Sequence, residues 1–89
     1  MYNLPKRIQI KYLNVQSWTD EKNTALIGHL TKNDPDIILI TSTSRLDHQR
    51  PIRIHNYYTF SVNKANERHA GAAIAIKQNI KFEIKYCNL

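Results

Sequence analysis

Asn14 and a row of four hydroxyl residues, Thr41–Ser44, are the polar groups whose positions in the chain could form a ligand site. Asn14 ends an alternating apolar stretch, and the hydroxyl row directly follows the apolar run Ile37–Ile40. In open α/β sheets, ligands bind outside the carboxyl ends of the strands, so two strand ends that meet would bring these groups together. A second interpretation stays open, in which Asn14 forms a turn and the hydroxyls cap backbone groups in an exposed loop.

This site requires the two apolar stretches to be parallel neighbours in one sheet. The alternation over residues 7–14 is typical of a strand with one buried face, and the run Ile37–Ile40 is typical of a central strand covered on both faces. Residues 18–33 predict a helix of about three turns, with Thr19 or Asp20 as its N-cap and acidic residues in its first turn. Strand, helix and strand form a βαβ unit, in which the two strands run parallel.

The rest of the chain predicts antiparallel strands. Residues 45–56 are polar and basic, contain a proline and indicate a loop. Three strands are expected after it, over residues 57–62, 71–77 and 80–86. We therefore expect an α/β fold, with a βαβ unit followed by antiparallel strands in one mixed sheet.

The length and composition allow one small domain. The chain has 89 residues, a mass of 10.4 kDa and a formal net charge of +6, with a pI near 9.7. No stretch approaches the roughly 20 apolar residues of a membrane-spanning helix, and MYNLPKR at the amino end lacks the apolar centre of a secretory signal. These features predict a soluble intracellular protein, cytoplasmic or nuclear, with no membrane partner.

The charge and the cysteine content bear on the class of ligand. The single cysteine, Cys87, cannot form an internal disulfide, and the four histidines show no paired Cys/His spacing suited to structural zinc. The excess of positive charge favours a polyanion such as nucleic acid, although many small proteins are basic for solubility alone.

Three motifs in register resemble one protein family. They are Leu13-Asn14, the run PDIILI over residues 35–40, and AGAAIAI over residues 70–76. In this order and at these distances they are similar to the amino-terminal part of the endonuclease/exonuclease/phosphatase superfamily, whose members include deoxyribonuclease I. The closest likeness is to the endonuclease domains of non-LTR retrotransposons of the jockey kind, and it covers nearly the whole chain from Ile8.

The resemblance implies a four-layered α/β sandwich that cleaves phosphodiester bonds in DNA with the help of Mg²⁺. In the family, a glutamate at the end of the second strand holds the metal, and the asparagine of the first strand lies near the metal and the phosphate. Aligned through Pro35, these positions fall on Ser42 and Asn14. Ser42 brings neither the charge nor the reach of a glutamate, so Mg²⁺ binding here is doubtful and the metal position is degenerate.

Other catalytic groups of the family have no counterpart in these 89 residues. The family carries its general base and transition-state-binding residues in a second half, which this sequence does not reach. Asp47 would have to swing in from a loop to replace the glutamate, and Asp47 and His48 are adjacent, so they cannot share a proton in the required geometry. We therefore expect an amino-terminal portion of such a domain with little or no activity alone. Its uncovered sheet face should promote self-association.

The alternative hypothesis is a non-catalytic basic module that binds nucleic acid or a protein partner through a sheet edge and a cationic surface. Arg68 and His69 could contact a phosphate, although a polar hairpin turn explains both residues and is the favoured interpretation. The candidates for a cationic rim facing DNA are Lys6, Arg7, Arg45, Arg50 and Arg53.

The sequence also predicts how four further residues pack in the fold. One of Tyr57 and Tyr58 should point into the core, since neighbours on a strand face opposite sides, and the other could stack on a base. Trp18 should fasten the start of the helix to the sheet. Gly71 should permit another element to approach the start of its strand closely.

Overall fold

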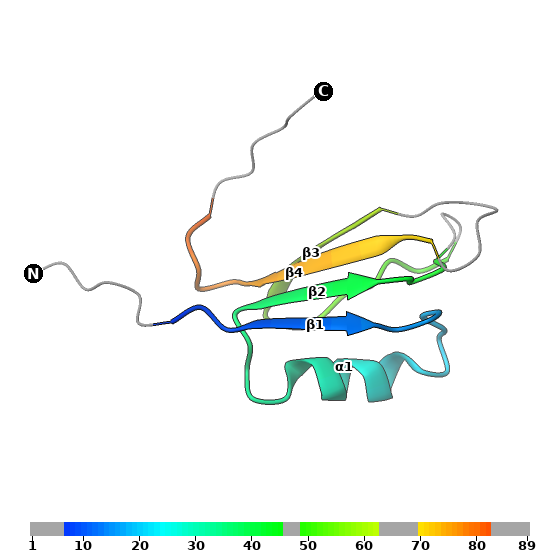
Figure 1. The fold of residues 1–89 in the computed structure, drawn as a ribbon, viewed down its shortest axis with the longest axis horizontal. Coiled ribbons are helices and arrows are strands. Elements are labelled where there is room, and N and C mark those ends of the chain that lie inside the picture. Colours follow the sequence, from blue (N-terminus) through cyan, green and yellow to red (C-terminus); the bar gives the residue numbers. More distant parts are fainter. Residues whose placement is uncertain (1–6, 46–48, 63–69, 83–89) are drawn as a thin grey trace, which may run out of the picture.

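The fold contains four strands and one helix, seen in a computed structural model that describes residues 7–45, 49–62 and 70–82 (Figure 1). The elements follow the predicted order. They are β1 (Ile10–Asn14), α1 (Asn23–Thr31), β2 (Ile37–Thr41), β3 (Tyr57–Val62) and β4 (Ala72–Lys77).

The four strands form one mixed sheet in the order β1-β2-β4-β3. β1 and β2 run parallel, with Ile10 opposite Ile37 and Asn14 opposite Thr41. β4 is antiparallel to both of its neighbours, β2 and β3. The predicted α/β class and the parallel pairing of the first two strands are confirmed, because α1 returns the chain to the end of the sheet from which β1 began (Figure 1).

The helix begins later than the sequence predicts. Its N-cap residue is Lys22, with no side-chain cap, and the helix itself has nine residues and no acidic residue in its first turn. Thr19 instead forms a turn before the helix, in which its carbonyl oxygen and its hydroxyl both accept from the Lys22 amide, at 3.1 and 3.3 Å. The prediction of Thr19 or Asp20 as N-cap is therefore wrong. Asp20 is engaged elsewhere, by Arg45.

The end of α1 follows the prediction from the proline. Asn33 and Asp34 both adopt a left-handed backbone, with φ of 66° and 54°, and reverse the chain before Pro35. The Pro35 carbonyl oxygen then accepts a hydrogen bond of 2.6 Å from the Tyr57 hydroxyl. This contact ties the reversal to the first residue of β3.

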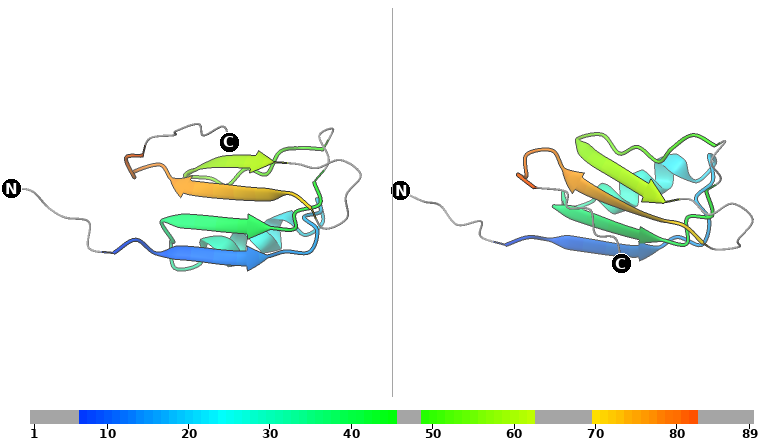
Figure 2. Two further views of the ribbon diagram at one scale, coloured as in Figure 1. Left: turned by 45° about the horizontal axis from the view of Figure 1, so that its top comes forward. Right: turned by 90° about the horizontal axis from the view of Figure 1, so that it is seen from above.

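One face of the sheet carries the core. α1 and the segment 49–56 cover it, and Figure 2 shows the helix behind the strands. Ile38 and Ile40 of β2 are fully buried on this face, and Trp18 packs into the same cluster, so its predicted role at the start of the helix is confirmed. The remaining core residues are Leu30, Ile52, Ile54, Tyr57, Ala73 and Ala75.

The other face has no covering layer among the described residues, and the expectation that β2 is covered on both faces is wrong. Leu39, between two buried isoleucines, is 37 % exposed. The large apolar side chains exposed to solvent, several of them on this face, are Ile8, Ile10, Tyr12, Leu39, Tyr58, Phe60, Val62 and Phe82.

Phe82 makes the only ring contacts on this face within the described residues. Its ring packs edge to face on Tyr58 and Phe60, with centroids 5.8 and 6.2 Å apart. Residues 80–82 are not a strand, contrary to the prediction of a strand over 80–86, and residues 83–86 lie outside the described part. The chain therefore leaves β4 and places Phe82 against the exposed aromatic rings of β3.

Candidate functional site

The carboxyl ends of β1 and β2 lie side by side, as the sequence predicts. Asn14 and Thr41 are the paired last residues of the two strands. The two segments that follow stay together, because the amides of Val15, Ser17 and Trp18 donate to the carbonyl oxygens of Thr41, Ser42 and Thr43. These bonds measure 3.1, 2.8 and 2.7 Å. Asn14 and Ser42 therefore belong to one rim at this edge of the sheet.

The hydroxyl row is held on its second side by the start of β4. The amides of Thr43 and Ser44 donate to the carbonyl oxygens of Gly71 and Ala70, at 3.3 and 2.7 Å. Ser42 and Ser44 both have a left-handed backbone, with φ of 59° and 50°. These values are uncommon for residues other than glycine, asparagine and aspartate, so bonding from two sides fixes a locally unfavourable conformation.

Gly71 makes this bonding possible. Its φ is +93°, and a Cβ placed there would lie 2.5 Å from Thr43 Oγ1 and 3.2 Å from the Val62 carbonyl oxygen. No side chain fits between these atoms. The predicted role of Gly71 in permitting a close approach is confirmed, and the element that approaches is the hydroxyl row itself.

Some side chains of the rim form hydrogen bonds and others do not. Asn14 Oδ1 accepts a 3.3 Å hydrogen bond from the Gln16 amide, so the turn role left open for Asn14 is observed. Thr41 Oγ1 pairs with the Tyr12 hydroxyl at 2.9 Å. Thr43 Oγ1 and Ser44 Oγ are buried without a hydrogen-bond partner among the described residues. Ser42 is half-buried, and its hydroxyl has no hydrogen bond to another described residue.

The residues present at the rim do not fit a Mg²⁺ ion. A hard divalent cation takes oxygen ligands that include carboxylates, whereas this rim offers one amide oxygen, already engaged by Gln16, and neutral hydroxyls. Across residues 7–45, 49–62 and 70–82, no group of three or more His, Cys, Asp or Glu side chains is arranged to hold a metal. Asp47, the one replacement considered from the sequence, lies outside the described residues together with His48.

Arg45 does not belong to an exposed cationic rim, and this prediction is wrong. Its side chain is 3 % exposed and its donors are directed inward. Nη1 donates to the Trp18 carbonyl oxygen at 3.0 Å, Nε donates to the Arg50 carbonyl oxygen at 2.9 Å, and Nη2 pairs with Asp20 Oδ1 at 2.7 Å. Arg45 therefore joins the turn before α1 to the segment after the hydroxyl row.

Sequence reasoning missed this pairing of Arg45 with Asp20. The two residues are 25 positions apart and share no motif, so only the folded chain brings them together. The hydrogen bond from Arg45 and its charge hold the pKa of Asp20 below the ordinary value of 3.8, with a smaller contribution from Arg50. Asp20 consequently stays ionised beside two guanidinium groups.

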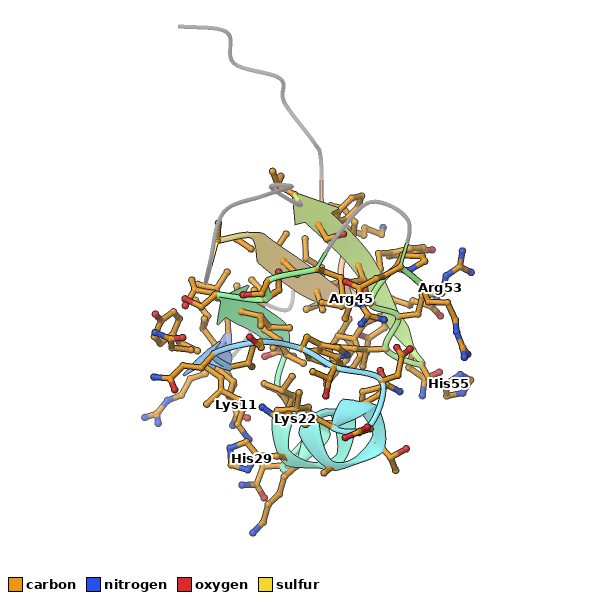
Figure 3. The ribbon with its side chains drawn as sticks, turned by 90° about the vertical axis from the view of Figure 1, so that its right-hand side faces the viewer. Lys11, Lys22, His29, Arg45, Arg53 and His55 are labelled. Carbon is orange, nitrogen blue, oxygen red and sulfur yellow. The ribbon has the colours of Figure 1, made fainter. Side chains whose placement is uncertain are left out.

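The other predicted cationic residues are partly accessible. Arg7, Arg50 and Arg53 are exposed, while Lys6, Arg68 and His69 lie outside the described residues. Figure 3 looks onto the edge where β1 and β2 end, and it shows Arg53 projecting outward while Arg45 points into the molecule.

A second ionic cluster lies at the opposite end of β2 and is structural. Lys77 Nζ lies 2.8 Å from Asp34 Oδ2 and 3.5 Å from Asp36 Oδ1. The hydrogen bond to Asp34 raises the pKa of Lys77. Burial raises the pKa of Tyr57, the tyrosine that points inward, whereas Tyr58 is 48 % exposed. The prediction that one of the two tyrosines belongs to the core is confirmed.

Neither a scan against protein-family models nor a search among curated proteins returned a match for this sequence. Among the described residues, no helix has the length and apolar character needed to cross a membrane.

Proposed function

We propose that this chain is the amino-terminal portion of a phosphodiesterase-type α/β domain, related to the retrotransposon endonucleases it resembles, and that it does not hydrolyse DNA by itself. The observation that carries the proposal is the shared rim: parallel β1 and β2 bring Asn14 and Ser42 to adjacent strand ends. This is where the resemblance puts the asparagine and the metal-binding glutamate.

The chemistry of the rim supports the loss of activity. Phosphodiester hydrolysis in such a domain depends on a cation that neutralises the phosphate and stabilises the leaving oxygen. Ser42 supplies a neutral hydroxyl at the position of the anionic ligand, and Asn14 Oδ1 is used in a turn. Loss of an outer partner alone costs about 10 to 100-fold in metal affinity or activity, so loss of the principal anionic ligand should cost more.

The uncovered sheet face supports the assignment as one portion of a larger sandwich. A sheet buries an apolar face against a second layer, and here Leu39, Tyr58 and Phe60 are exposed on a face with no described layer over it. In a four-layered sandwich, a second sheet with its own helix layer would cover this face. The mixed strand order β1-β2-β4-β3 fits one half of that arrangement.

A nicking assay on supercoiled plasmid with Mg²⁺ tests the proposed inactivity. The native chain should give no more nicked plasmid than buffer. The proposal is contradicted if the native chain nicks the plasmid and Asn14→Ala abolishes the nicking, because the rim would then be a working catalytic site. Thr24→Ala, an exposed helix position away from the rim, serves as the matched control.

A second candidate function is a binding module without catalytic ancestry, and one observation favours it. The same apolar face and the edge strand β3, which pairs only with β4, are available for a protein partner among the described residues. Under this alternative, the unmodified chain and Ser42→Glu behave alike towards divalent cations.

A further inference from the structure

A depression beside the start of α1 is lined mainly by charged residues. It has a volume of about 250 Å³ and is lined by Asp20, Asn23, Arg45, Arg50, Pro51 and Arg53. Three arginines and one aspartate therefore line the same small space. A larger depression of about 630 Å³, between residues 51–56 and β3, has no comparable concentration of charge.

Arg45 supplies charge and rigidity to this depression. Its guanidinium is buried, and its hydrogen bonds to Trp18, Asp20 and Arg50 leave the side chain no freedom to reorient. The Asp20 side chain that neutralises it is 66 % exposed, so water screens the carboxylate more than it screens the buried cation. With three arginines and one aspartate, the lining keeps a net formal charge of +2 despite the ion pair.

Arg50 and Arg53 are the accessible donors. Neither forms an ion pair with an acidic side chain among the described residues. Ile52 and Ile54 are each 3 % exposed, and burial of these two alternate side chains requires Arg53 between them to point outward. The bond from Arg45 Nε to the Arg50 carbonyl oxygen fixes the backbone at Arg50. Both arginines are therefore presented by a backbone that is already ordered, which lowers the entropic cost of binding.

Asn23, the first residue of α1, adds a side-chain donor to the same space. The backbone amides of Lys22 and Asn23 already donate to the carbonyl oxygens of Thr19 and Asp20, at 3.1 and 3.3 Å, so at these two residues the helix start contributes its dipole, which favours an anion. Asn23 Oδ1 accepts from Trp18 Nε1 at 3.0 Å, which leaves the amide group of Asn23 as a donor. Asp20 is the one group that opposes an anion.

We propose that this depression binds a phosphate group, held by Arg50 and Arg53 with support from the side-chain amide of Asn23. The planar guanidinium groups match the oxygens of phosphate in bidentate geometry, and the net charge of the lining favours a dianion or a polyanion. The group can belong to free phosphate or to a nucleic acid strand. No residue of the Asn14 and Ser42 rim takes part, so this site does not depend on the function proposed above.

Trp18, the single tryptophan of the chain, is a built-in reporter because its indole donates to Asn23 at the edge of the depression. The experiment titrates the full chain with inorganic phosphate and, separately, with a single-stranded oligothymidine, and follows tryptophan fluorescence and arginine Nε–Hε resonances. A response to phosphate with no tighter binding of the oligonucleotide identifies a small-anion site. Tighter, salt-dependent binding of the oligonucleotide identifies a nucleic acid site.

Arg50→Gln and Arg53→Gln test the residues, and Lys32→Gln is the matched control because it removes the same charge from the exposed opposite end of α1. Each arginine variant should weaken binding roughly tenfold, the loss expected for one charge-assisted contact. Lys32→Gln should change binding less than about twofold by comparison. Equal weakening in all three variants, or no response of the native chain to either probe, overturns the proposal. Plasmid nicking does not enter this readout, so the two proposals fail separately.

Discussion

Replacement of Gly71 by alanine should destabilise the fold strongly, because the hydroxyl row lies where the new methyl group must go. Two effects combine. The backbone at φ +93° is unfavourable for a residue with a Cβ, at a cost of about 1–2 kcal/mol. Overpacking against Thr43 Oγ1, 2.5 Å from the new atom, costs about 1–3 kcal/mol.

The sum of roughly 2–5 kcal/mol is a large part of the 5–15 kcal/mol that stabilises a typical domain. Urea unfolding followed by Trp18 fluorescence should show a lower midpoint with an unchanged slope. Thr43→Ala in the Gly71→Ala background removes the hydroxyl oxygen at 2.5 Å, so the double variant should recover most of the overpacking cost. The backbone cost and the 3.2 Å contact with the Val62 carbonyl oxygen should remain.

Gly28→Ala is the matched control for Gly71→Ala. Gly28 lies in α1, and an added Cβ meets no atom within 4 Å, so alanine should stabilise the helix by roughly 0.5–1 kcal/mol. The reasoning is refuted if Gly71→Ala is as stable as the native chain. It is also refuted if Thr43→Ala restores nothing, because the close contact would then have no energetic consequence.

Three further predictions concern the rest of the fold. Arg45→Met should lower the free energy of unfolding by roughly 2–4 kcal/mol in urea titrations, because the carbonyl oxygens of Trp18 and Arg50 lose their donor. A change below about 0.5 kcal/mol would show that the hydrogen bonds of Arg45 are not needed for stability. Tyr58→Lys and Phe60→Lys should reduce the self-association measured by sedimentation velocity, because they place charge on the uncovered face. Thr24→Lys in α1 should leave self-association unchanged. A native chain that is monomeric at all concentrations would contradict this prediction. The depressed pKa of Asp20 gives stability that is present above about pH 3.8 and is lost as the pH falls through the lower pKa of the folded state. The difference in unfolding free energy between the native chain and Asp20→Asn should therefore shrink below pH 4. A constant difference from pH 2 to 6 would exclude the ion pair as its source.

The succession of the elements along the chain and the parallel pairing of β1 with β2 were predictable because the apolar periodicity is local, whereas the position of β4 between β2 and β3 was not predicted. Ile37–Ile40 and the alternation before Asn14 mark two strands, and the helix between them requires a parallel arrangement. The meeting of Asn14 with the hydroxyl row follows from this topology alone. The role of Gly71 was predictable in part, because a glycine at the start of a strand indicates that another element approaches its backbone closely. The sequence does not show that this element is the hydroxyl row.

Three of the wrong predictions, at Asp20, Arg45 and Phe82, have one physical cause, which is tertiary contact. Asp20 is a residue type that often caps helices, but Arg45 binds its carboxylate. A separate turn at Thr19 places the start of the helix further along the chain. Arg45 appeared to be a surface residue because nothing local shows that three acceptors surround it. Phe82 fits a strand pattern, yet its ring packs on Tyr58 and Phe60. In each case a partner more than twenty residues away outweighs the local preference.

The central claim, that the rim of Asn14 and Ser42 is a degenerate cation site, is tested most directly by restoring the carboxylate. Paramagnetic broadening by Mn²⁺ should be recorded on isotopically labelled native chain, on Ser42→Glu, and on Ser61→Glu, which adds the same charge at an exposed position of β3. We predict broadening of the Asn14 resonances only in Ser42→Glu, with cation affinity at least about tenfold above the other two chains. Equal broadening at Asn14 in the native chain, or none in Ser42→Glu beyond that in Ser61→Glu, would contradict the account.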